Sequence, residues 1–105
     1  MSPEDIEALV HNNTAVALYF SGEDCGVCNA LKPKIEELLE QKFPFIKRAF
    51  LDTKEHLEVA AWLGVFGVPT LIIFIEGKEY IREGRAMSIH TLEEKLTRIY
   101  EILER

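Results

Sequence analysis

Two long apolar runs constrain the fold of this chain more than any other feature of its sequence. Residues 15–20 and 70–75 contain almost no polar side chains. A strand with one face in water alternates apolar and polar residues, whereas a strand buried on both faces is apolar throughout. The two runs therefore predict strands of a sheet that helices cover on both faces, which makes the chain an α/β protein.

Helical spacing and turn signals account for most of the remaining chain. Apolar residues recur at steps of three and four in two long segments, which predicts amphipathic helices. Glu76-Gly77, between two short strand-like runs, predicts a tight hairpin. Four helices are predicted: one that begins at Ser2, one over residues 25–42, one over residues 56–63 and one that begins at Ser88 or Thr91. Two further strands are predicted over residues 45–51 and 79–83. This order predicts a four-stranded mixed sheet in a single domain of residues 1–105.

The composition excludes several classes of function. The chain has 105 residues and a formal net charge of −6, whereas a general nucleic-acid binder needs a basic face. Residues 59–75 form the longest stretch without Asp, Glu, Lys or Arg, and this stretch is too short and too interrupted for a membrane helix. The acidic start differs from a secretory signal, so we expect a cytoplasmic protein. Two cysteines and three histidines predict neither a disulfide scaffold nor a metal site of its own.

A Cys25-Gly26-Val27-Cys28 motif stands where the first apolar strand gives way to a helix. The free N–H groups and the dipole of a helix N-terminus favour a thiolate, the form of cysteine that attacks disulfides. Cys25 can therefore open a substrate disulfide, and Cys28, one turn deeper, can resolve the mixed disulfide. A bare pair with this spacing is also found as half of a zinc ribbon, as an iron–sulfur ligand pair or as two inert cysteines.

The motif and its surroundings resemble the thioredoxin family. Pro33 follows the cysteine pair inside the predicted helix, as the helix-kinking proline of the family does. Residues 64–70 resemble the family's loop before its cis-proline, residues 74–78 resemble its hairpin, and Gly84 resembles its downstream glycine. The resemblance covers nearly the whole chain. It implies a thioredoxin fold and thiol–disulfide oxidoreductase activity.

The same resemblance implies roles for individual residues. Cys25 would be the nucleophile and Cys28 the resolving thiol. The Val68–Pro69 peptide bond would be cis, which leaves the Val68 backbone free to pair with an extended substrate chain near the sulfurs. For Phe66, a place in the core is an equal alternative to a place in the substrate site. The residues implied to line a shallow apolar groove around Cys25 are Val27, Phe66, Val68 and Gly84.

The chain departs from the family's usual pattern beside the cysteines. Asp24 replaces a tryptophan and Val27 replaces a proline, while Tyr19 stands where many thioredoxins bury an aspartate. Glu23, Asp24 and Tyr19 are therefore candidate modulators of the Cys25 thiolate, and the two acids are expected to oppose the helix dipole. The missing buried acid removes a group that would help the resolving thiol lose its proton.

The resemblance also suggests how the sheet ends. The chain begins too late to hold the extra strand that precedes the first helix in usual thioredoxins. Residues 45–51 are therefore expected to be an edge strand, where Lys47 and Arg48 discourage edge-to-edge pairing. We expect a monomer, with a dimer through this edge as the alternative.

The leading functional hypothesis is an enzyme that reduces protein disulfides and supports redox homeostasis in the cytoplasm. Its partners would be disulfide-containing proteins and a recycling reductase that the sequence does not identify, and no cofactor is expected. One alternative is a non-catalytic binding module of the same fold, and another is a dimer that shares a metal ion through two cysteine pairs. A glutaredoxin-like use of glutathione is a third alternative, against which the acidic Glu23-Asp24 flank argues.

Overall fold

The two apolar runs form the centre of a four-stranded sheet. The computed structural model describes residues 1–103, and its elements are α1 (Pro3–His11), β1 (Ala15–Ser21), α2 (Gly26–Lys42), β2 (Lys47–Asp52), α3 (Leu57–Trp62), β3 (Thr70–Ile75), β4 (Lys78–Glu83) and α4 (Ile89–Leu103). The strand order is β2-β1-β3-β4, with β2 parallel to β1 and with β3 antiparallel to both β1 and β4. The mixed sheet is confirmed, and so is the position of β2 at an edge.

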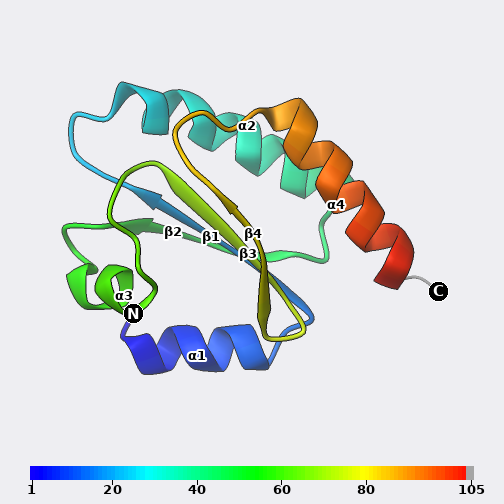
Figure 1. Cartoon of the computed structure of the whole chain (residues 1–105), viewed down its shortest axis with the longest axis horizontal. Helices are drawn as coiled ribbons and strands as arrows, with labels where there is room; N and C mark the ends of the chain where they lie inside the picture. Colours follow the sequence, from blue (N-terminus) through cyan, green and yellow to red (C-terminus); the bar gives the residue numbers. More distant parts are fainter. Residues whose placement is uncertain (104–105) are drawn as a thin grey trace.

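Helices cover both faces of this sheet (Figure 1). α2 and α4 lie on one face, and α1 and α3 lie on the other. Successive residues of a strand point to opposite faces, so β1 contributes Ala17 and Tyr19 to the first core and Leu18 and Phe20 to the second. Burial on both faces is the reason that β1 is apolar at almost every position.

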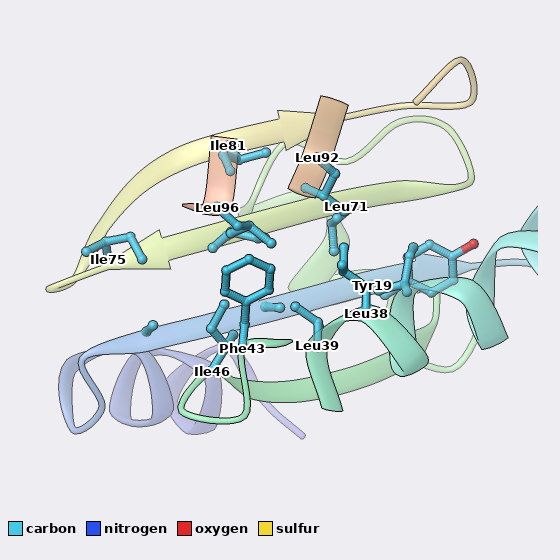
Figure 2. Close-up of a cluster of buried hydrophobic side chains, with 14 residues drawn as sticks. Tyr19, Leu38, Leu39, Phe43, Ile46, Leu71, Ile75, Ile81, Leu92 and Leu96 are labelled. Carbon is cyan, nitrogen blue, oxygen red and sulfur yellow. The ribbon is translucent and has the colours of Figure 1, made fainter. Parts of the chain in front are cut away.

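The core beneath α2 and α4 is drawn in Figure 2. Leu38 and Leu39 of α2 and Phe43 just after it pack toward Leu71 of β3. Tyr19 lies at one end of this cluster, with its hydroxyl group turned away from the other labelled side chains. The amphipathic pattern of α2 therefore fixes which of its faces meets the sheet, and the polar end of Tyr19 marks where the core meets the start of that helix.

The local signals at the turns and helix ends are largely confirmed. Glu76 and Gly77 both have positive φ angles, 51° and 82°, as a two-residue hairpin requires. β2 begins two residues later than predicted, because the N–H of Ile46 donates to the carbonyl of Phe43 and a turn closes the end of α2 there. α3 begins one residue later, since His56 has a non-helical φ of −131°. None of the helices within residues 1–103 is long and apolar enough to cross a membrane.

Candidate active site

Cys25 caps the N-terminus of α2, directly after the loop that follows β1. Its backbone is extended, with φ −103° and ψ 94°, and its carbonyl accepts the N–H of Asn29 at 3.1 Å. Its Sγ atom accepts a hydrogen bond from the backbone N–H of Cys28, also at 3.1 Å. The sulfur thus takes the position that a side-chain oxygen takes in most N-caps.

The two cysteines of the motif are joined in a disulfide. Their Sγ atoms are 2.10 Å apart and their Cα atoms 5.2 Å apart. Both residues are buried, but Cys25 keeps the larger exposed fraction, 6% against 1% for Cys28. When the pair is reduced, the N–H of Cys28 and the positive end of α2 are placed to stabilise a thiolate on Cys25.

Tyr19 ties the first turn of α2 to the sheet. Its hydroxyl donates a hydrogen bond of 2.9 Å to the backbone carbonyl of Cys28, and the residue is almost fully buried. Burial raises the pKa of the Tyr19 phenol above its ordinary value. The phenol therefore keeps its proton at neutral pH, so Tyr19 acts here as a hydrogen-bond donor and does not accept a proton from a cysteine.

The acidic loop before Cys25 is less negative than its sequence suggests. Glu23 forms an ion pair with Lys54, whose Nζ atom lies 3.3 Å from Glu23 Oε1, and both side chains are largely exposed. Asp24 adopts a positive φ of 51°, a conformation that aspartate tolerates better than most residues. Lys54 follows β2, so the fold brings a positive charge to the loop that the sequence argument had not counted.

A second loop reaches the same end of the sheet, just before β3. Its Val68–Pro69 peptide bond is cis, as expected. A Cβ atom added to Gly22 would lie 3.2 Å from Cγ2 of Val68, so the Val68 side chain packs over the loop that leads to Cys25. The hydroxyl of Thr70 donates to the carbonyl of Gly67 at 2.7 Å and holds this loop from its other side. The cysteine loop and the proline loop are therefore neighbours, although some 40 residues separate them in the chain.

Comparison with known proteins agrees with this geometry. The model of the family described as Thioredoxin matches residues 1–98. The chain is 37% identical to the "Thioredoxin-like protein YdfQ" of Bacillus subtilis over 99 residues, which cover 94% of this chain and 88% of the relative. It belongs to the thioredoxin family.

Solved structures of thioredoxins superimpose well on this chain. Thioredoxin 1 of Thermosipho africanus is 31% identical, with a TM-score of 0.78 and coverage of 86% of this chain and 99% of the other. Fasciola hepatica thioredoxin is 29% identical, with a TM-score of 0.79 and coverage of 92% and 93%. The thioredoxin fold is thereby confirmed. Family membership together with the Cys25–Cys28 pair makes the protein a thiol–disulfide oxidoreductase.

The other residues predicted to line the substrate site of this thioredoxin-family protein differ in how exposed they are. Phe66 is 93% exposed, so the alternative that it belongs to the core is wrong. Val27 lies half-buried in the first turn of α2. Gly84 lies in the exposed turn after β4, where its carbonyl accepts the N–H of Met87 at 3.1 Å. Their roles in binding a substrate stay predictions.

Sequence reasoning missed three residues that shape this end of the molecule. Thr53 and Leu57 line a groove together with Phe66 and Val68. Arg82 of β4 donates hydrogen bonds to the carbonyls at the end of α3. Leu57 could have been noticed, because it is a large apolar residue outside the face of α3 that carries Val59. No signal in the sequence pointed to Arg82, whose partners depend on the sheet.

Proposed function

We propose that the protein reduces protein disulfides, with Cys25 as the nucleophile and Cys28 as the resolving thiol. The observation that carries these roles is the N-cap geometry: Cys25 Sγ accepts the N–H of Cys28 and is the more exposed of the two residues. A thiolate there is stabilised by a fixed donor and by the helix dipole. Cys28 lies deeper and is reached by a disulfide only after Cys25 has brought it close.

The reaction proceeds by two exchanges of a sulfur–sulfur bond. The Cys25 thiolate attacks one sulfur of the substrate disulfide, the substrate bond breaks, and the other substrate sulfur leaves as a thiolate. Cys28 then attacks Cys25 Sγ, the mixed disulfide breaks, and the second substrate sulfur leaves. The substrate gains two electrons, and the protein is left with the Cys25–Cys28 disulfide. A recycling reductase must return two electrons to this pair.

The proton of Cys28 has to leave during the second exchange. Tyr19 cannot accept it near neutral pH, because burial raises the pKa of its phenol and its hydroxyl already donates to the Cys28 carbonyl. The same step releases the second substrate sulfur as a thiolate, and this thiolate is a base that can take the proton from Cys28. Proton transfer from Cys28 to that sulfur balances the step without a buried carboxylate.

Substrate chains are proposed to bind along the loop that contains the cis-proline. In the part of the chain that the structure describes, no backbone hydrogen bond uses the N–H or the C=O of Val68. These two groups are therefore available to pair with an extended segment beside the cysteine, as an added strand pairs with a sheet edge. Val27, Phe66 and Gly84 complete the proposed apolar surface around Cys25.

We further propose that the protein works as a monomer in the cytoplasm. Both cysteines of the chain belong to the redox pair, so none remains for the structural disulfides that are common in oxidising compartments. The two sheet edges carry charged side chains, Lys47 on β2 and Lys78, Glu79 and Arg82 on β4, which oppose edge-to-edge association.

Reduction of insulin disulfides, with dithiothreitol as the electron source, tests the proposed activity. We expect turnover by the unaltered chain and accumulation of a mixed disulfide through Cys25 when Cys28→Ser is used. Faster alkylation of Cys28 than of Cys25 near neutral pH would contradict the assignment of roles. Absence of turnover, together with metal in protein purified under reducing conditions, would instead favour the metal-sharing dimer.

A further inference from the structure

The outer edge of β2 has no partner strand, because β2 stands at the end of the sheet. Just past β2, the N–H of Thr53 donates to the carbonyl of Ser21 at 2.9 Å, and Ser21 pairs in register with Asp52. The N–H and C=O of one strand residue point to the same side, and those of the next residue point to the opposite side. The odd-numbered residues of β2 therefore bond to β1, and the backbone groups of Arg48 and Phe50 point outward. Within residues 1–103, no backbone hydrogen bond outside the sheet uses these groups.

The side chains along this edge carry positive charge on both faces of the sheet. Phe50 points toward the face that α2 covers, where its ring meets that of Tyr19, and the Nζ atom of Lys32 lies 5.2 Å from the centre of the Phe50 ring. Arg48 lies two residues before Phe50 and therefore shares this face. Lys47 is exposed and belongs to the opposite face. We call this set of residues the β2 edge: Lys32, Lys47, Arg48 and Phe50.

The three cations of the β2 edge have no carboxylate partner in the described part of the chain. The ion pairs found there use other basic residues: Lys42, Lys54, Arg82, His90 and Lys95. A shortage of acids is not the cause, since the chain has 18 acidic residues against 12 lysines and arginines. Asp52, the one acid within β2, lies at the far end of the strand, where its Oδ1 atom accepts the N–H of Lys54. The cations of this edge are therefore available to a carboxylate from outside.

These charges decide which kind of strand the β2 edge accepts. Lysine and arginine at an edge repel a second copy of the same edge, which is how many proteins prevent edge-to-edge aggregation. The same charges attract an extended segment with acidic side chains, because ion pairs then form together with the ladder of backbone hydrogen bonds. The edge therefore suits an acidic strand of another polypeptide better than a second copy of this chain.

We propose that the β2 edge binds an extended acidic segment of a partner polypeptide, which adds a fifth strand to the sheet. The backbone of this segment pairs with the outward groups of Arg48 and Phe50. Carboxylates on one of its faces pair with Arg48 and Lys32, and a carboxylate on its other face pairs with Lys47. The inference goes beyond the proposed function, because the β2 edge contains neither cysteine and no residue of the cis-proline loop. A partner held at this edge leaves Cys25 open.

Titration of the oxidised protein with designed peptides tests the proposal. The acidic peptide is a short extended segment in which Glu alternates with Val and Thr, and a matched peptide has Lys in place of each Glu. A third peptide is the acidic one with methylated backbone nitrogens at two adjacent central residues, since a strand in either direction needs the N–H of one of them. The variants are Arg48→Gln, Lys32→Gln and, as the control, Lys34→Gln, which changes another exposed lysine of α2. Chemical shifts and hydrogen exchange of the backbone amides of residues 47–51 report binding.

We expect the acidic peptide at saturation to slow hydrogen exchange at the amides of Arg48 and Phe50 by about tenfold or more. The amides of Ala49 and Leu51 should keep their exchange rates, because they already bond to β1. Absence of binding by the acidic peptide, or equal binding of the lysine peptide or the methylated peptide, would overturn the proposal. Slow exchange at Arg48 and Phe50 that increases with protein concentration in the absence of peptide would show that a second copy occupies the edge, and this result would overturn it too.

The variants test the ion pairs separately from the backbone ladder. Arg48→Gln and Lys32→Gln should each weaken binding of the acidic peptide by about two- to fivefold, and added salt should weaken it as well. Lys34→Gln should leave the affinity unchanged, and a loss as large as that of Arg48→Gln would contradict the assigned site. None of these measurements depends on turnover, so their outcome is distinct from that of insulin reduction.

Discussion

The two faces of the sheet serve the active site in different ways. On one face, α2 brings the Cys25–Cys28 pair to the end of β1, and Tyr19 fixes the first turn of that helix from the core. On the other face, the core beneath α1 and α3 supports the loop that carries Phe66 and Val68, because Val59, Ala60 and Val65 belong to that core. The first face thus holds the sulfur chemistry, and the second holds the surface that we propose recognises the substrate.

This division shows why a redox pair and a substrate surface can change independently. The cysteine pair depends on a helix N-terminus, which α2 provides whatever lies on the opposite face. The groove depends on the loop between α3 and β3, whose position is set by Arg82 and by the second core. A buried substitution that shifts α2 should therefore alter the chemistry, and one that shifts the loop between α3 and β3 should alter the recognition.

The largest effect is expected from the cysteines. Cys25→Ser should abolish turnover of every disulfide substrate, because the only thiol placed to start the exchange within the described site is lost. The measurement is insulin reduction alongside hydroxyethyl disulfide reduction. Residual turnover by Cys25→Ser that Cys28→Ser abolishes would show that the two cysteines have the opposite roles.

Two isoleucines, one from each core, test the division between the faces directly. Ile35 of α2 and Ile72 of β3 are both fully buried, so replacing either with Ala should lower the free energy of unfolding by about 2–5 kcal/mol. Denaturant unfolding measures this loss. Ile35→Ala should also slow alkylation of Cys25, whereas Ile72→Ala should raise KM for polypeptides only. The division is wrong if both variants slow the alkylation of Cys25 or if both raise KM for polypeptides.

Val27 lies between the two cysteines, on the face of the sheet that carries α2, and is expected to influence the reduction potential of the pair. The family usually has proline at this position, which lacks an N–H, so we expect the N–H of Val27 to favour the reduced pair. We expect a reduction potential between roughly −270 mV and roughly −120 mV. Val27→Pro should lower the potential, as equilibration with glutathione can measure. A value for the unaltered chain at or below −270 mV, or no downward shift in the variant, would show that the valine does not act in this way.

The smallest expected effect comes from Tyr19. Tyr19→Phe removes the hydrogen bond to the Cys28 carbonyl and should lower the free energy of unfolding by about 0.5–1.5 kcal/mol at neutral pH. Because the pKa of Tyr19 is higher in the folded protein than in the unfolded chain, the folded state holds this proton more tightly. The contribution of Tyr19 to the free energy of unfolding is therefore complete below pH 10 or so, and it is lost as the pH rises through the folded-state pKa of the phenol.

Unfolding of both proteins between neutral pH and pH 11 or so provides the measurement. The difference in stability between the unaltered chain and Tyr19→Phe should shrink at the alkaline end. The pH dependence of turnover near neutral pH should have the same midpoint in both proteins, since the phenol does not carry the proton of Cys28. A shifted midpoint would falsify the donor role.

Much of the fold and part of the site could be predicted because their signals are local. The strand runs, the Ser2 helix start and the Glu76-Gly77 turn each depend on neighbouring residues and were confirmed. The cysteine pair was predictable for the same reason, since a strand followed at once by Cys-x-x-Cys places the sulfurs at a helix end. The exposure of Phe66 was not predictable, because an apolar residue in a loop fits a core or a surface equally well.

Local patterns in the chain were enough to assign strands and helices, the apolar faces and the position of the redox pair. Contacts between distant residues were not readable in this way: the Tyr19 hydroxyl on the Cys28 carbonyl, Lys54 beside Glu23, and, farther from the pair, Arg82 on the carbonyl of Leu63. Periodicity tells which side of an element faces the core, but not which distant residue lies opposite. That pairing is set by strand order and register, and these exist only once the sheet has formed.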